Sequence, residues 1–125
     1  MDTSGLPLEI TNFLTDYVES IGHLEVILLL HSYPNKEWNA EDLSRELRSN
    51  VTSATTKLQQ LLAKGLINIS SSNKFIYSPS AELDLVITRL QGIYLERPVA
   101  VVTFIYEKPA DKLKGFADAF KFKKD

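Results

Sequence analysis

The sequence predicts a mainly α-helical domain with a small β-hairpin. Apolar residues recur at helical spacing over most of the 125 residues, and helix-capping residues precede several of these segments. The periodicity changes between residues 66 and 77, where short β-branched and aromatic runs flank a polar turn. With 44% hydrophobic and 24% charged residues, the chain is long enough for one domain, residues 1–125, with its own core.

Two helices are expected at the N-terminal end. Apolar residues between Ile10 and Ile21 follow the i, i+3, i+4, i+7 spacing of one helix face, which predicts a helix from about residue 6 to residue 20. The segment 21–33 is apolar on almost all sides, as is typical of a buried central helix. Pro34 ends it, because proline restricts the preceding residue and cannot continue the helix.

Capping residues predict two further helices in the middle of the chain. Asn39 is a suitable N-cap for a short helix that ends near residue 48. Asn50 is a second cap, and the helix that it opens, residues 51–64, carries its leucines on one face. Gly65 stands where a left-handed residue commonly ends a helix.

The C-terminal half begins with a hairpin and continues with helices. Residues 66–69 and 75–77 form the two strands of the predicted hairpin, in a sheet of two or three strands. After Ser80, which caps a helix, the segment 98–106 is compatible with either a helix or a buried strand. The Lys-rich segment 108–125 is amphipathic. We expect its apolar face to form a packing or dimer contact and its last lysines to contact DNA, whereas three Asp residues disfavour binding to an anionic membrane.

The order of helix, short helix, turn, capped helix and hairpin is that of a winged helix-turn-helix. Residues 39–47 (NAEDLSREL) look like the first helix of this motif in bacterial winged-helix regulators. The pattern Leu58-x-x-Leu61-x-x-x-Gly65-Leu66-Ile67 is similar to the end of their recognition helix and the start of the wing. The resemblance predicts a winged helix-turn-helix core over residues 21–79 and a C-terminal helical extension over residues 80–125.

This resemblance implies binding of double-stranded DNA, with the helix over residues 51–64 in the major groove. A homodimer through the terminal helices is expected, because one such module buries little surface and dimers bind paired half-sites. Small hydroxyl, amide and basic side chains of the motif are the candidate DNA contacts: Asn50, Thr52, Ser53, Thr56, Lys57, Gln60 and Lys64 on the second helix and its cap, Arg45 and Arg48 before it, and Ser72, Asn73 and Lys74 in the wing.

The charge distribution agrees with this interpretation, although the net charge of the chain is −2. Residues 1–35 contain five acidic residues and no Lys or Arg. Residues 45–81 contain five Lys and Arg and one Glu, and residues 108–125 contain six Lys and three Asp. The motif and the tail are therefore the basic parts of an acidic chain, as phosphate recognition requires.

Several other functions are excluded or disfavoured by composition. The absence of Cys excludes thiolate catalysis and cysteine-bound zinc or iron–sulfur sites. His23 and His31 lie about 12 Å apart along one helix, too far to share a metal ion directly. The sequence has no nucleophile motif and no glycine-rich phosphate loop, so we expect neither enzyme activity nor a cofactor.

The apolar runs are too short for a membrane span, and Lys36 is the first basic residue, so no secretory signal is expected. A cytoplasmic protein is the resulting expectation.

One alternative function remains open. The helix over residues 51–64 contains no Arg, although Arg is the residue that most often reads guanine. A winged helix that binds another protein, and not DNA, is therefore the second interpretation. Trp38, just before the short helix, is expected to pack in the core or against the wing.

Overall fold

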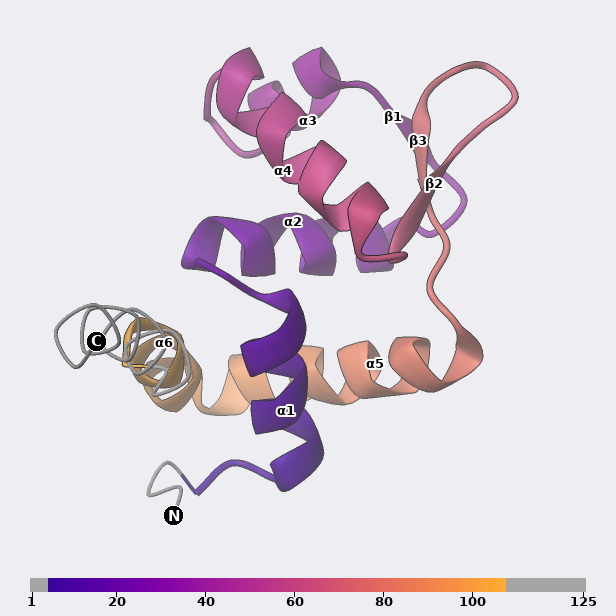
Figure 1. Ribbon diagram of the computed structural model, residues 1–125. Coiled ribbons are helices and arrows are strands. Elements are labelled where there is room, and N and C mark those ends of the chain that lie inside the picture. Colours follow the sequence, from indigo (N-terminus) through magenta and orange to yellow (C-terminus); the bar gives the residue numbers. More distant parts are fainter. Residues whose placement is uncertain (1–4, 108–125) are drawn as a thin grey trace, which may run out of the picture.

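The computed structural model describes residues 5–107, which form helices and a small antiparallel sheet, as the sequence predicts (Figure 1). The helices are α1 (Leu8–Tyr17), α2 (Ile21–Ser32), α3 (Ala40–Glu46), α4 (Val51–Ala63), α5 (Ala81–Glu96) and α6 (Pro98–Tyr106). The strands are β1 (Glu37–Trp38), β2 (Ile67–Ile69) and β3 (Phe75–Tyr77). The predicted segment 108–125 lies outside the described residues.

Asn39, Asn50 and Ser80 begin helices as predicted, and Ser20, which the sequence analysis did not select, begins α2. In four helices the side chain of the cap accepts a hydrogen bond from the backbone N–H three residues further on; these caps are Ser20, Asn39, Asn50 and Ser80. Gly65 has φ +80°, so it ends α4 in the left-handed conformation that favours glycine.

The segment 98–106, for which the sequence allowed two structures, is the helix α6. Pro98 occupies its first turn, where a missing N–H costs no helical hydrogen bond. Val101 and Ile105 lie four residues apart on the same side and are buried. The helix contacts both α5 and α1, so the tertiary environment selects the helical form.

The sheet has the strand order β1-β3-β2, and both pairings are antiparallel. Glu37 and Trp38 of β1 lie opposite Ile76 and Phe75 of β3. A strand of two residues is too short to show an alternation of apolar and polar residues in the sequence. The strand β1 is therefore recognised only by its pairing with β3. Trp38 is 1% exposed, which confirms its predicted place in the core.

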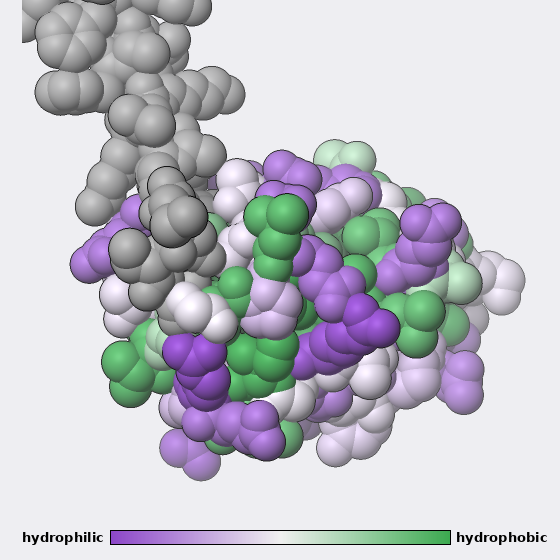
Figure 2. Space-filling model, turned by 90° about the horizontal axis from the view of Figure 1, so that it is seen from below, coloured by the Kyte–Doolittle hydropathy of each residue, from purple (hydrophilic) through white to green (hydrophobic). Residues whose placement is uncertain are grey.

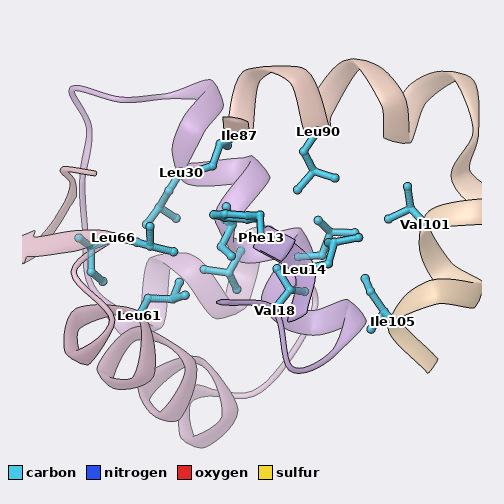
Figure 3. Close-up of a cluster of buried hydrophobic side chains, with 14 of the residues drawn as sticks. Phe13, Leu14, Val18, Leu30, Leu61, Leu66, Ile87, Leu90, Val101 and Ile105 are labelled. Carbon is cyan, nitrogen blue, oxygen red and sulfur yellow. The ribbon is translucent and has the colours of Figure 1, made fainter. Parts of the chain in front are cut away.

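One continuous hydrophobic core joins the two ends of the described chain. Figure 3 shows Leu61 of α4 and Leu66, just before β2, on one side of this cluster and Val101 and Ile105 of α6 on the other. Phe13 and its neighbours on α1 fill the space between them. The terminal helices therefore share their core with the helix-turn-helix.

The helices nevertheless divide into an upper and a lower group around α2. In Figure 1, α3, α4 and the sheet lie above α2, while α1, α5 and α6 lie below it. No helix within residues 5–107 combines the length and the apolar character that crossing a bilayer requires.

Candidate nucleic-acid interface

A four-residue turn joins α3 to α4. The backbone N–H of Ser49 donates to the carbonyl oxygen of Ser44, which closes the turn at the end of α3. Arg48 adopts φ +54°, a left-handed conformation that is uncommon outside glycine. The Asn50 side chain then accepts the N–H of Ser53 at 2.7 Å and begins α4. The helix-turn-helix geometry thus follows from one left-handed residue and one cap.

Two sides of α4 have opposite environments. Ala54, Leu58 and Leu61 are buried against the rest of the domain. The opposite side is exposed, and we call it the outer face of α4: Thr52, Thr56, Gln59 and Ala63. In Figure 1 this helix lies at the top of the molecule, and α1, α5 and α6 lie on the far side of α2. The outer face therefore has no other described helix over it.

A third side of α4 is polar and faces the start of α2. There the Nε2–H of His23 donates a hydrogen bond to Oε1 of Gln60. The Ser20 side chain, which caps α2 by accepting the His23 backbone N–H, lies 3.0 Å from Nδ1 of the same ring. Because His23 is only 5% exposed, desolvation lowers its pKa below the ordinary value of 6.5, against the opposing effects of Gln60 and Glu19.

The two lysines of α4 also lie on this inner flank. The Nζ of Lys64 donates to the backbone carbonyl of Asp16 at 2.8 Å and lies 3.7 Å from a carboxylate oxygen of Glu19. The Nζ of Lys57 donates to the Ser53 hydroxyl. A Cβ added at Gly22, at the start of α2, would lie 2.5 Å from Cε of Lys57, so glycine allows this close approach.

The structure therefore divides the predicted contact residues of α4. Thr52 and Thr56 lie on the outer face, whereas Lys57, Gln60 and Lys64 are half-buried along α1 and α2. Helical periodicity predicts one common face, opposite the leucines, for Thr52, Ser53, Thr56, Lys57, Gln60 and Lys64. This grouping is wrong, because the α1–α2 connection covers one flank of that side. Gln59, which the sequence analysis did not select, belongs to the outer face; its spacing from Thr52 and Thr56, i+7 and i+3, was the available signal.

The other predicted contacts surround α4. Arg45 and Arg48 are exposed, and Arg45 forms an ion pair with Asp42 at 2.5 Å. In the wing, Ser72 and Asn73 are exposed and Lys74 is half-buried. The wing contacts α4 through β2, so these side chains are held beside the helix.

The wing tip is anchored to β1. Asn73 has φ +62°, which completes the tight turn. The Ser70 hydroxyl donates to a carboxylate oxygen of Glu37 at 2.6 Å and accepts the backbone N–H of Lys74 at 3.2 Å. The hydrogen bond from Ser70 lowers the pKa of Glu37; desolvation opposes this effect, and Ser72 and Lys74 add smaller lowering contributions.

The described residues form no metal site, and a small cavity lies beside α4. Within residues 5–107, no group of three or more His, Asp or Glu side chains is placed to hold a metal ion. A cavity of about 60 Å³ lies between α2, α3 and α4, and it is lined by Gly22, Glu25, Val26, Leu43, Leu47, Ser49, Ala54 and Lys57. Ligand pockets are commonly about 300–1,000 Å³, so this cavity suits at most a few waters.

Comparison with solved structures identifies the fold. The chain is similar to MepR, a transcription regulator of the Staphylococcus aureus multidrug efflux pump MepA, with a TM-score of 0.53 and 12% sequence identity. The similarity covers 94% of this chain and 88% of that one. The chain has the winged helix-turn-helix fold. No protein-family model matches the sequence, and no curated protein matches it.

In this fold α3 and α4 are the helix-turn-helix, and β2 and β3 form the wing. Both assignments agree with the resemblance seen in the sequence. The helices α1, α5 and α6 are included in the similarity as well, because it covers nearly the whole chain.

Proposed function

We propose that the chain is a DNA-binding transcriptional regulator that places α4 in the major groove of duplex DNA. The outer face of α4 carries this proposal, because it is polar, exposed and free of other described helices, with the wing at its side. An α-helix of this kind fits the major groove, where base edges are accessible. The similarity in fold to a transcription regulator supports the same class of function.

The contacts follow from the positions of the side chains. In this proposal Arg48, in the turn before α4, and Lys74, in the wing, bind DNA phosphates. Further contacts to the DNA backbone in this proposal come from Arg45, Asn50, Ser53, Ser72 and Asn73. Lys57, Gln60 and Lys64 support α4 from its inner flank, and each must leave its present partner before it contacts DNA.

Salt-dependent binding to duplex DNA tests the proposal. Each phosphate contact contributes about 0.9 to the slope of log K against log salt concentration. We expect Arg48→Ala to weaken binding to all duplexes and to lower the slope by about 1. Arg89→Ala is the matched control, because Arg89 lies on α5 and forms an ion pair with Glu9. Fluorescence anisotropy with a labelled duplex measures the affinity and its salt slope. Equal slopes for the wild type, Arg48→Ala and Arg89→Ala contradict the proposal, and so does the absence of binding at low salt.

A protein-binding winged helix is the second candidate function. The observation in its favour is that the outer face of α4 carries no charged side chain, while the net charge of the chain is −2. In that case purified protein shows no salt-dependent retention on duplex DNA at any salt concentration. The same titration therefore separates the two candidates.

We further propose a cytoplasmic homodimer formed through the terminal helices. Apolar side chains on these helices are exposed: Leu8, Leu85, Leu95, Val99 and Tyr106. Figure 2 views the molecule from the side of α1 and α5, where hydrophobic residues gather among hydrophilic ones. Exposed apolar side chains that cluster on one surface are typical of surfaces that pair with another chain.

Sedimentation equilibrium tests the dimer. Leu95 is 79% exposed, so Leu95→Asp leaves the core intact and lowers the dimer fraction. Ile69→Asp is the matched control, because Ile69 is 54% exposed but lies in the wing. A wild-type protein that is monomeric at micromolar concentration contradicts this proposal.

A further inference from the structure

We propose that the outer face of α4 selects A·T base pairs, by contact with thymine methyl groups and with the adenine edge. This inference rests on the proposed DNA binding and specifies which bases the helix recognises. It depends on which side chains the structure leaves available and which it engages elsewhere.

The side chains that read guanine are not available on this face. Guanine presents its O6 and N7 acceptors to the major groove, and Arg or Lys are the usual partners. The cations of α4 and its C-terminal cap are Lys57 and Lys64. Lys57 donates to Ser53, and Lys64 donates to the carbonyl of Asp16 and lies beside Glu19. Both lysines are therefore engaged on the inner flank.

The usual partner of cytosine is absent as well. The cytosine amino group is typically read by the carboxylate of Asp or Glu. The segment Val51–Ala63 contains neither residue type. The helix thus lacks the preferred side chains for both bases of a G·C pair.

The outer face presents methyl groups. The hydroxyl of Thr56 already donates to the carbonyl oxygen of Thr52 at 3.1 Å, which leaves the methyl group of Thr56 as its main contact surface. Ala63 is exposed near the end of the helix and adds a further methyl group to this face. Thymine carries a methyl group in the major groove, and apolar side chains bind it.

Gln59 is the side chain that can read adenine. Its amide is exposed and carries both a donor and an acceptor, as the N7 and N6 positions of adenine require. Gln60, the next residue, faces His23, so the two glutamines differ in their availability. With a rise of 1.5 Å per residue, Thr52 and Gln59 lie about 10 Å apart along the helix, enough to span about three base pairs.

The first experiment separates this inference from the proposed function. Wild-type protein is titrated onto a duplex of random sequence at several salt concentrations, and bound sequences are then selected from a randomised duplex pool. We expect salt-dependent binding and a selected site with A·T pairs at the positions that face α4. Salt-dependent binding without base preference, or with G·C pairs at these positions, overturns the inference alone. The absence of any binding overturns the proposed function and the inference with it.

The second experiment assigns the contacts on the selected duplex. Replacing one adenine at a time by 7-deazaadenine removes the N7 acceptor, and replacing thymine by uracil removes the methyl group. At one adenine we expect 7-deazaadenine to weaken wild-type binding about fivefold, the value of one hydrogen bond. At one or more thymines, uracil weakens it by a few-fold.

Two alanine variants complete the test. In Gln59→Ala the effect of 7-deazaadenine disappears, whereas in Gln60→Ala, the matched control on the same helix, it remains fivefold. An effect that persists in Gln59→Ala, or that is absent from the wild type at every adenine, refutes the role of Gln59. Uracil substitutions without effect at every thymine refute the methyl contact.

Discussion

Replacing Gln60 by Ala tests whether this side chain supports the fold or contacts DNA. The Oε1 atom of Gln60 accepts the Nε2–H of His23, so the bond joins α4 to the start of α2. His23 is 5% exposed, and in the variant its Nε2–H loses the acceptor in a place that water reaches poorly. A buried donor without a partner destabilises a protein by about 1–3 kcal/mol.

The expected loss of stability is therefore about 1–3 kcal/mol for Gln60→Ala. For a domain of this size, 1 kcal/mol corresponds to about 4 °C, so the melting temperature falls by about 4–12 °C. Gln59→Ala is the matched control, because Gln59 directly precedes Gln60 on the same helix and is exposed. Its effect should stay within about 0.5 kcal/mol.

Urea denaturation followed by circular dichroism measures both variants. The slope with denaturant should not change, because the folded state remains equally compact. If Gln59→Ala and Gln60→Ala reduce stability equally, the described contact with His23 has no energetic role. If Gln60→Ala instead alters base preference without loss of stability, Gln60 contacts DNA and the assignment of the inner flank is wrong.

Three further predictions concern the same region. Burial lowers the pKa of His23, so the folded state binds a proton less readily than the unfolded state. The free energy of unfolding is therefore highest above pH 6.5, as far as this group is concerned, and decreases as the pH falls below 6.5. In urea titrations between pH 5 and 8, His23→Gln removes this part of the decrease. A pH dependence that is unchanged in that variant contradicts this origin. Leu58 is fully buried, so Leu58→Ala lowers the free energy of unfolding by about 2–5 kcal/mol in the same assay, and a loss below 1 kcal/mol contradicts the packing described. Arg48→Gly removes the strain of a left-handed backbone at a residue with a side chain, so it raises the free energy of unfolding by up to about 1 kcal/mol. The loss of the Arg48 charge weakens DNA binding. Thermal melting measures the first effect and fluorescence anisotropy the second, and a lower melting temperature counts against the reasoning.

The main elements of the fold were predictable because their signals are local. Asn50 caps α4 and Gly65 ends it, and both residues act within a few positions of themselves in the chain. The strand β1 was not predictable as a strand, because Glu37 and Trp38 become one only through pairing with β3. Likewise, residues 98–106 have an apolar pattern that fits a helix or a strand, and the contacts of α6 with α1 and α5 decide between them.

The candidate site was predictable only in part. Helical periodicity correctly placed Thr52 and Thr56 away from the leucines. It also placed Gln60 and Lys64 there, since periodicity describes one helix and contains nothing about its neighbours. Their actual partners, His23 and the carbonyl of Asp16, lie 37 and 48 residues away in the sequence. The selection of Gln59 over Gln60 therefore required the tertiary structure.

The pairing of Glu37 with Ile76 has a consequence for the order of folding. These residues are 39 positions apart, so β1 and β3 close a long loop that contains α3, α4 and β2. The β2–β3 hairpin closes a much shorter loop, and short loops close at a lower entropic cost. The hairpin is thus expected to form first, and β1 joins it once α3 and α4 have packed. Docking of β1 then connects the wing to the segment that leads into the helix pair.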